Sequence, residues 1–317
     1  MTRINILIVA LLCAVPLSVS AQQLRLNRQQ KFPDDMPAGN YSGITPIGGD
    51  RYAVVSDKTA DGFYVFHISI DSVSGRIVSV GNEGFRPSGH DSRDQEGIAW
   101  CPRSRTLFIS GEADNQILEY DADGRRTGRR LQVPATFSQL SGNYGLESLC
   151  YDAVSHRFYT VSERPARGDS LLWLTAFDDS GRVVAQYAYA LDGVKPKRRG
   201  TLVNGVSELC ALGDGRLLVL ERTLRVTPLK IGSYAETRLY VVSPTADAQP
   251  LAKSLLCSFR TRINLFRRNF ANYEGLCVAR RGADGTLVLL LIADSQNRYR
   301  GLLRDWLRTI VVNDSGG

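Results

Sequence analysis

Asp94-Gln95-Glu96-Gly97-Ile98-Ala99 contains the clearest copy of a four-residue phrase that recurs along the whole chain. In each copy, an acidic or hydroxyl residue near the start leads into a short apolar segment. The five copies are Ser42-Gly43-Ile44-Thr45, Glu96-Gly97-Ile98-Ala99, Glu147-Ser148-Leu149-Cys150, Ser207-Glu208-Leu209-Cys210 and Glu274-Gly275-Leu276-Cys277. Self-similarity of this kind is typical of folds built from stacked copies of one structural unit.

The same succession of apolar segments follows every copy. A turn leads to a second segment that ends at an acidic residue, and a third segment comes after it. The second segments are 52–55, 107–109, 158–161, 217–220 and 287–292, and the third are 63–70, 117–120, 171–177, 238–242 and 307–312. The first four units add a fourth segment, at 77–80, 131–133, 186–191 and 254–259.

Four short strands that repeat every 50 to 65 residues, without helical periodicity, predict an all-β fold of propeller type. Each unit would be one four-stranded antiparallel blade. Five blades are favoured, and six stay possible because 164–202 and 251–270 are long enough to contain further strands. The fifth unit lacks a fourth segment, so we expect the start of the mature chain, 24–32, to complete it and close the ring.

The amino terminus predicts export. Arg3 precedes an apolar run from Ile6 to Val15, and small residues follow up to Ala21. This pattern is that of a secretory signal peptide over residues 1–21, which leaves 22–317 as one domain in the periplasm or outside the cell. No later segment is apolar for the roughly 20 residues that a membrane-spanning helix needs, so we expect no transmembrane segment.

Antiparallel pairing of the first and second strands predicts one acidic face. The start of the first strand lies beside the end of the second, so both sets of acids should reach the same mouth of the central channel. The first strands would contribute an inner ring of Glu96, Glu147, Glu208 and Glu274. The first unit has Ser42 at this position and adds no carboxylate to the ring. The second strands would add the acids just behind it: Asp57, Glu112, Glu163, Glu221 and Asp294.

Carboxylates gathered at one mouth repel one another unless something neutralises them. A hard cation with oxygen ligands, Ca²⁺ before Mg²⁺, is one solution. In the other, the carboxylates accept hydrogen bonds from backbone amides and pair with Arg164 and Arg222 without a metal. Both alternatives stay open from the residues alone.

Other catalytic patterns are scarce. The chain has no Gly-x-Ser-x-Gly sequence, so a serine hydrolase of the common α/β type is unsupported. Of its three histidines, only His90 precedes an acid of the predicted mouth, in a loop with Asp94. The candidate catalytic residues are therefore Glu96, His90, Asp94, Arg164 and Arg222.

The phrases resemble the phytase-like family, described as "esterase-like activity of phytase". The resemblance covers about 41–312 and rests on Asp94 to Ala99, Asn143 to Leu149, Ser207 to Leu209 with Leu218 to Arg222, Tyr273 to Leu276, and Ala293 to Asn297. Propellers of the SdiA-regulated type share similar phrases and are a weaker second resemblance. What the resemblance implies is an exported bacterial β-propeller that hydrolyses a phosphoester or an ester.

Two functions follow as hypotheses. The first is a Ca²⁺-dependent hydrolase of a small anionic or ester substrate, in which a metal-bound water attacks and an arginine holds the anion. The second is a binding or scaffold propeller of the cell envelope, in which the acids only order the loops. Unpaired carboxylates that face one point would favour the first, and fully satisfied ones the second.

The distribution of charge bears on binding partners, and the cysteines bear on disulfide bonds. The formal net charge is +7, but the basic clusters lack interleaved aromatic residues, so we expect no nucleic acid partner and a monomer. The clusters are 125–130, 195–199 and 267–268. Five cysteines follow the signal peptide, and we expect them to pack as small apolar residues, with a Cys101–Cys257 disulfide left open.

Overall fold

The computed structural model describes residues 23–139, 145–193, 200–228, 230–247, 249–263 and 269–313. The predicted signal peptide and the basic clusters at 195–199 and 267–268 lie outside the described residues. Among the described residues, two short 3-10 helices, η1 (Ala135–Gln139) and η2 (Tyr299–Gly301), are the only helical segments. None of the described helices is long and apolar enough to cross a lipid bilayer.

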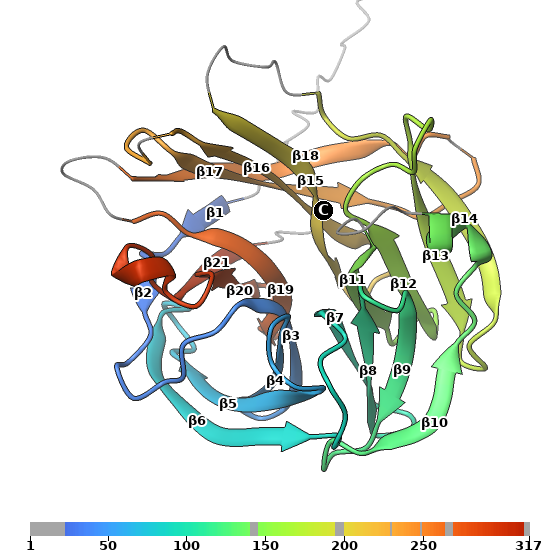
Figure 1. Cartoon of the computed structure of the whole chain (residues 1–317), viewed down its shortest axis with the longest axis horizontal. Helices are drawn as coiled ribbons and strands as arrows, with labels where there is room; N and C mark the ends of the chain where they lie inside the picture. Colours follow the sequence, from blue (N-terminus) through green and yellow to red (C-terminus); the bar gives the residue numbers. More distant parts are fainter. Residues whose placement is uncertain are drawn as a thin grey trace, which may run out of the picture.

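The fold is a five-bladed β-propeller, as the repeated phrase predicts. Each blade is an antiparallel sheet, and the innermost strands β3, β7, β11, β15 and β19 contact one another in a closed ring (Figure 1). The blades are β3 (Tyr41–Gly48), β4 (Arg51–Ser56), β5 (Gly62–Ile70) and β6 (Ile77–Pro87); β7 (Gln95–Cys101), β8 (Thr106–Gly111), β9 (Gln116–Tyr120) and β10 (Arg126–Leu131); β11 (Leu146–Asp152), β12 (Arg157–Ser162), β13 (Leu172–Asp178) and β14 (Val183–Tyr189); β15 (Thr201–Ala211), β16 (Leu217–Val226), β17 (Tyr234–Val242) and β18 (Lys253–Arg262); and β19 (Asn272–Arg281), β20 (Leu287–Asp294), β21 (Trp306–Asn313) and β1 (Gln23–Leu26).

The amino-terminal strand closes the ring, which confirms the predicted closure. β1 pairs antiparallel with β21, Leu24 opposite Val312, and the short β2 (Gln30–Lys31) extends the same edge. The last blade takes its outer strand, β1, from the other end of the chain, so this blade also has four strands. Closure of this kind removes an exposed edge and joins the two ends of the fold.

One strand differs from its predicted position. The fourth strand of the second blade is β10, at 126–131, whereas the sequence pattern placed it at 131–133. Four of its six residues are exposed and Arg-rich, and only Leu131 is buried. An outermost strand has little to bury, so its sequence lacks the apolar signal by which the inner strands are found.

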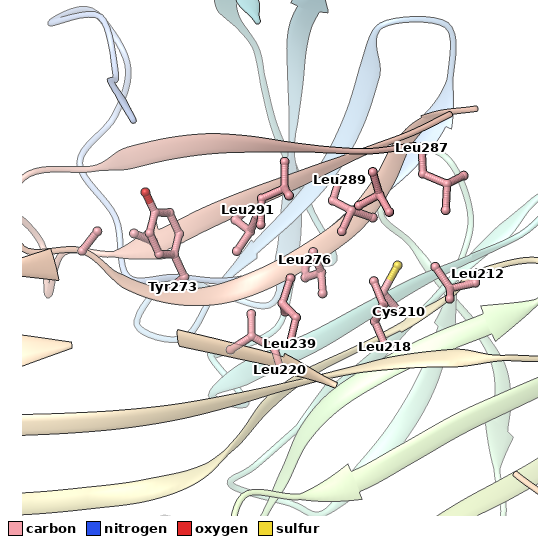
Figure 2. Close-up of a cluster of buried hydrophobic side chains, with 14 of the residues drawn as sticks. Cys210, Leu212, Leu218, Leu220, Leu239, Tyr273, Leu276, Leu287, Leu289 and Leu291 are labelled. Carbon is pink, nitrogen blue, oxygen red and sulfur yellow. The ribbon is translucent and has the colours of Figure 1, made fainter. Parts of the chain in front are cut away.

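Leucine-rich clusters between neighbouring blades form the core. Figure 2 shows the cluster between the fourth and fifth blades, where Leu220 and Leu239 pack against Leu276, Leu289 and Leu291. All five side chains are at most 2% exposed. Burying one such side chain contributes about 1.5–3 kcal/mol, so these interfaces hold adjacent blades together.

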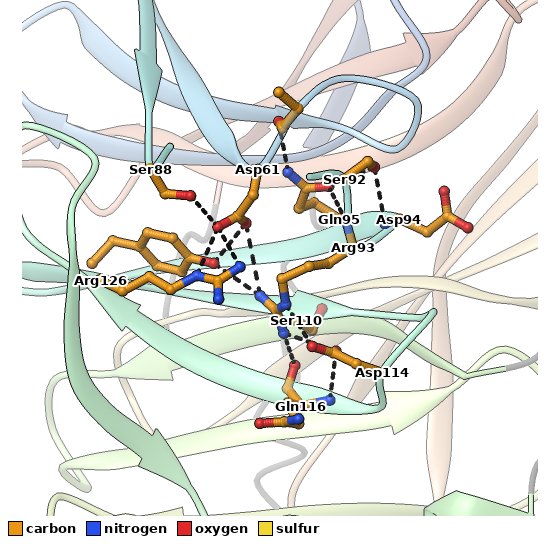
Figure 3. Close-up of polar contacts among 12 residues, drawn as sticks. Asp61, Ser88, Ser92, Arg93, Asp94, Gln95, Ser110, Asp114, Gln116 and Arg126 are labelled. Carbon is orange, nitrogen blue, oxygen red and sulfur yellow. Dashed lines mark hydrogen bonds and ion pairs between the residues drawn. The ribbon is translucent and has the colours of Figure 1, made fainter. Parts of the chain in front are cut away.

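A buried carboxylate fastens the first blade to the second. Asp61, fully buried, accepts hydrogen bonds from the Tyr120 hydroxyl (2.7 Å) and from Arg126 Nε (2.8 Å), as Figure 3 shows. Beside it, Arg93 donates from Nε and Nη2 to Asp114, at 2.7 and 2.9 Å. Since Arg93 lies three residues before Glu96, this network fixes the segment that delivers Glu96 to the channel.

All five cysteines of the described chain are free, and four of them are buried. Cys101 lies on the inner strand of the second blade and Cys257 on the outer strand of the fourth, so the disulfide left open by the sequence does not form. The expectation that cysteines pack as small apolar residues is confirmed.

Candidate functional site

The ends of the second strands lie beside the starts of the first strands at one mouth of the channel. The N–H of Asp57 donates to the Asn40 carbonyl (3.1 Å), and that of Glu112 to the Asp94 carbonyl (2.8 Å). Both bonds join the residue after a second strand to the residue before the first strand of the same blade. This backbone pairing brings the acids of the two sets together, as antiparallel order predicts.

A β-bulge presents the first acid of the phrase. In the second blade, Gln95 pairs with Gly111 and Ile98 with Ile109, so Glu96 and Gly97 have no partner in regular register. The ladder shifts in the same way at Glu147 and Glu274. Bulges re-aim side chains next to functional sites, and here each bulge turns an acid out of the ladder.

The glycine of the phrase is needed where inner strands meet. A Cβ on Gly97 would lie 2.5 Å from the backbone nitrogen of Leu149 on the next inner strand. That distance is below any van der Waals contact, so only glycine allows the two backbones to approach this closely. The Glu-Gly pairing thus has two causes, an acid for the mouth and a glycine for the contact between blades.

Glu208 lies one position deeper than the predicted ring. The first residue of the phrase in the fourth blade is Ser207, and Glu208 takes the position that glycine holds in three other blades. Its carboxylate accepts hydrogen bonds from the N–H of Leu149 (3.2 Å) and of Leu209 (2.9 Å), while burial raises its pKa well above the usual value. Glu208 therefore links the third and fourth inner strands below the mouth.

Glu221 is also displaced by one position from the predicted outer set. Val206 pairs with Glu221 as Leu146 pairs with Ser162 in the third blade. Glu221 thus fills the place of a small residue, and Arg222 stands where the other four blades carry an acid. The sequence does hold this signal, because a small residue precedes each of the other acids: Ser56-Asp57, Gly111-Glu112, Ser162-Glu163 and Ala293-Asp294.

The side chain of Glu221 is fully buried among groups of the outer strands. It accepts hydrogen bonds from the Tyr189 hydroxyl (2.7 Å) and from Lys253 Nζ (2.6 Å). Lys253 Nζ also lies 4.8 and 4.3 Å from the ring centres of Tyr189 and Tyr240. These contacts tie the third blade to the fourth and account for Glu221 without any role at the mouth.

Arg222 is the central cation of the mouth. Its guanidinium donates from Nη2 to Glu163 Oε1 at 3.1 Å and contacts Glu274 through Nη1. Nε has no hydrogen-bond partner among the described residues. Arg164, from the same loop as Glu163, adds a second ion pair to that carboxylate, 3.5 Å from Nε to Oε2. One arginine therefore joins three consecutive blades at the site.

Glu96 and Glu147 are the least compensated acids of the mouth. Burial raises the pKa of Glu96 well above the usual value, helped by the charges of Glu147, Asp57 and Glu112 and opposed by a hydrogen bond with Ser42. Burial and the charge of Glu163 raise the pKa of Glu147, and the charge of Arg222 opposes the rise. Glu147 is 7% exposed.

The other acids of the mouth have partners. Glu112 accepts from the Gly145 N–H at 3.0 Å, and burial raises its pKa. Asp57 pairs with Lys58 (3.1 Å), which also bridges to Asp94 (3.0 Å), and burial raises the pKa of Asp57. Burial, with the charge of Asp57, raises the pKa of Asp294 to about 6.

His90 is exposed in the loop between β6 and β7. Its backbone carbonyl accepts the N–H of Asp61 (3.1 Å), whereas its imidazole makes no hydrogen bond or ion pair with a described residue. Asp94 lies at the rim with its Lys58 partner, about one third exposed. Of the five candidate catalytic residues, Glu96, Arg164 and Arg222 are therefore grouped around the buried acids, and His90 lies outside that group.

The acids differ in how well they suit a metal ion. No three Asp, Glu, His or Cys side chains in the described part of the chain are placed to hold one together. The donors are nevertheless the oxygen ligands that Ca²⁺ prefers, and Asp57 Oδ1 is buried without a hydrogen-bond partner. Asp57, Glu112 and Glu147 are the acids whose charges act on Glu96.

A family model described as phytase-like, "esterase-like activity of phytase", matches residues 36–296, well over half of the chain. No curated protein matches the sequence.

Several solved structures are similar to this chain at low identity, with TM-scores below 0.5. An exo-β-1,3-galactanase from Phanerochaete chrysosporium is 11% identical with a TM-score of 0.48, over 90% of this chain and 64% of that one. An endo-arabinase from Bacteroides thetaiotaomicron is 14% identical with a TM-score of 0.47, over 87% and 94%. The tail fibre of Staphylococcus aureus phage P68 is 11% identical with a TM-score of 0.47, over 93% of this chain and 53% of that one, about half its length.

Proposed function

The chain belongs to the phytase-like family, and from this premise we propose that it hydrolyses an ester or phosphoester at the acidic mouth of the propeller. The observation that carries the proposal is the environment of Glu147. This side chain is 7% exposed, and burial together with the charge of Glu163 raises its pKa. A carboxylate that only ordered a loop would be expected to lie beside hydrogen-bond donors or cations that lower its pKa.

The proposed roles follow from charge and pKa. A carboxylate with a raised pKa is a stronger base, so Glu147 or Glu96 accepts the proton of the attacking water. Arg222 Nε, which has no partner among the described residues, is available to donate to the negative charge that develops on the substrate oxygen. The same carboxyl group then returns its proton to the leaving alcohol, so the site ends as it began.

The net charge of the mouth separates two substrate classes. The mouth has three cations, Lys58, Arg164 and Arg222, and more carboxyl groups than cations. When these groups are ionised, the surface is acidic and repels an anion. The seven carboxyl groups are Asp57, Glu96, Glu112, Glu147, Glu163, Glu274 and Asp294. A neutral carboxylic ester meets no such barrier, whereas a phosphoester requires a cation at the site. When bound, Ca²⁺ would supply that charge and lower the pKa of a coordinated water. We propose Asp57, Glu96, Glu112 and Glu147 as its ligands.

A binding propeller without catalysis is the second candidate, and one observation favours it. Glu112, Glu163, Glu274 and Asp294 all have partners of the chain's own, among them the Gly145 N–H, Arg222 and the Gln296 N–H. Satisfied carboxylates of this kind order the loops at the mouth. The two candidates therefore assign different roles to Glu96 and Glu147, which are catalytic groups in the first and only order the loops in the second.

We also propose that the protein acts outside the cytoplasm, because its first 21 residues have the pattern of a signal peptide. In that setting, free Ca²⁺ is more available than in a cell interior. A monomer is the proposed oligomeric state.

The test is a panel of p-nitrophenyl and alkyl carboxylic esters, phosphomonoesters and phytate, assayed with purified mature protein in Ca²⁺ and in chelator. Turnover of carboxylic esters in both conditions, with phosphoesters cleaved only in Ca²⁺, is the expected pattern. Absence of turnover on the whole panel in Ca²⁺ would leave the binding propeller as the better account.

A further inference from the structure

An apolar cavity of about 130 Å³ opens beside the acidic mouth, between the fourth and fifth blades. Its walls come from β16, from the ends of the neighbouring loops and from the segment that follows β20. The apolar wall residues are Leu224, Val226, Ile263, Phe270, Leu302 and Leu303. A cavity of this size is comparable with the engineered cavity of about 150 Å³ that binds benzene.

The cavity exists because the fourth blade is longer than the others. In this blade, β15 and β16 continue to pair past the level of the mouth, from Gly205 opposite Arg222 to Thr201 opposite Val226. In the second blade, the corresponding pair ends at Gln95 opposite Gly111. Five further residue pairs extend roughly 17 Å at the usual rise of a strand. They raise a wall against which a ligand in the mouth would lie.

The polar residues that line the cavity are Lys230, Ser233, Asn272, Asp294, Gln296 and Tyr299. Asn272 and Asp294 line it and face each other across the β19–β20 ladder. Asn272 is 5% exposed, and its Nδ2 donates to Glu274 Oε1 at 2.8 Å. Because Nδ2 points toward Glu274, Oδ1 points away from it. That Oδ1 is buried and has no hydrogen-bond partner among the described residues. A buried acceptor left unpaired costs free energy, and a ligand with an O–H or N–H group would satisfy it.

We propose that this cavity binds the alcohol half of the substrate, an aromatic or short aliphatic group whose hydroxyl donates to Asn272 Oδ1 once the ester bond has broken. The assignment to a substrate rests on the proposed hydrolase function. Hydrolysis adds the water oxygen to the acyl carbon or phosphorus, breaks the bond to the alcohol oxygen and transfers one proton to that oxygen, which produces the donor.

Binding of benzyl alcohol to the whole protein, measured by calorimetry and ligand-observed NMR, tests the proposal without turnover. We expect saturable binding at least about tenfold tighter than that of toluene, which lacks the donor, or of methanol, which lacks the ring. Leu224→Trp, at a half-buried wall position, should abolish it by filling the cavity. Val154→Trp, at an exposed turn residue, is the matched control and should leave binding unchanged. Asn272→Leu should bring the affinity for benzyl alcohol close to that for toluene.

The outcomes separate this proposal from the function on which it rests. Benzyl alcohol that binds without saturation, or equally well to the native protein and Leu224→Trp, overturns the cavity assignment even if esters are hydrolysed. Saturable, Leu224-dependent binding without hydrolysis of any ester supports the ligand site and counts against the hydrolase.

Discussion

Arg222 of the fourth blade donates a hydrogen bond from Nη2 to Oε1 of Glu163 in the third blade, at 3.1 Å. The same guanidinium contacts Glu274 of the fifth blade, and all three side chains are at most 13% exposed. Because a single cation serves carboxylates from both neighbours, Arg222 joins the structure of the ring to the charge of its mouth.

Replacing Arg222 should therefore destabilise the fold. Arg222→Met leaves buried carboxylates without their cation, and breaking a buried pair in this way costs about 3–5 kcal/mol. Denaturant unfolding should show the loss, and Arg222→Met combined with Glu163→Gln should recover part of it. Arg125→Met, at an exposed pair with Asp123, is the control and should leave the free energy of unfolding unchanged. A single variant as stable as the native protein would contradict the assigned role.

Glu147→Gln should stabilise the protein at alkaline pH. The folded-state pKa of Glu147 is raised, so its contribution to stability is greatest below the unfolded value of 4.5 and falls as pH rises through the folded pKa. Glutamine cannot ionise, so Tm of the variant should exceed the native Tm at pH 8, by about 2 °C per kcal/mol, and the gain should shrink toward pH 4. Glu83→Gln, which changes a surface carboxylate paired with Arg51, should show no such trend. A pH-independent difference would argue that Glu147 is not titrating as described.

Calcium should raise the thermal stability of the native protein. An ion that binds only the folded state adds about 2.7 kcal/mol at one hundred times its dissociation constant. Because its carboxylate ligands must be deprotonated, the affinity should increase with pH. Glu96→Gln combined with Glu147→Gln should lose most of the response in differential scanning calorimetry. If neither Ca²⁺ nor chelator moves the native Tm, the metal proposal fails and the internally paired mouth stands.

Glu96→Gln should lower kcat by at least about 100-fold on the best ester of the panel, a typical effect of losing one electrostatic element of a site. The substitution keeps the shape of the side chain, so Tm should not fall. His90→Ala should cost much less, because the imidazole is exposed and makes no contact with the grouped acids in the described chain. Equal losses of kcat in both variants would indicate that His90 takes part in catalysis.

Gly97→Ala should disrupt the ring. The added methyl group would lie 2.5 Å from the backbone nitrogen of Leu149, which cannot move without its strand. Gly81→Ala in β6 is the matched control, because a Cβ there meets nothing within 4 Å. We expect a loss of about 1–3 kcal/mol or more for Gly97→Ala, as for overpacking against a rigid neighbour, and no loss for Gly81→Ala. Circular dichroism melts of the two variants would separate them.

The sequence by itself determined the repeat, and with it most of the fold. Five copies of the phrase, each followed by apolar segments at strand spacing, predicted five antiparallel blades and the closing role of the amino-terminal strand. Inner strands are buried on both faces, so their sequences carry a strong apolar signal. The exposed outer strand β10 carries little of it and was misplaced by several residues.

Only the tertiary structure decided the register at the mouth. A shift of one residue moves a side chain to the other face of a sheet, and in the fourth blade such a shift buries Glu221 among Tyr189 and Lys253 and brings Arg222 to the channel. The cavity beside Asn272 depends on the five extra residue pairs of β15 and β16. Strand pairing across a blade fixes these positions through hydrogen bonds between residues distant in the chain. The small residue before each of the other acids is a local trace of the register at the mouth, but the length of β15 and β16 has no such signal.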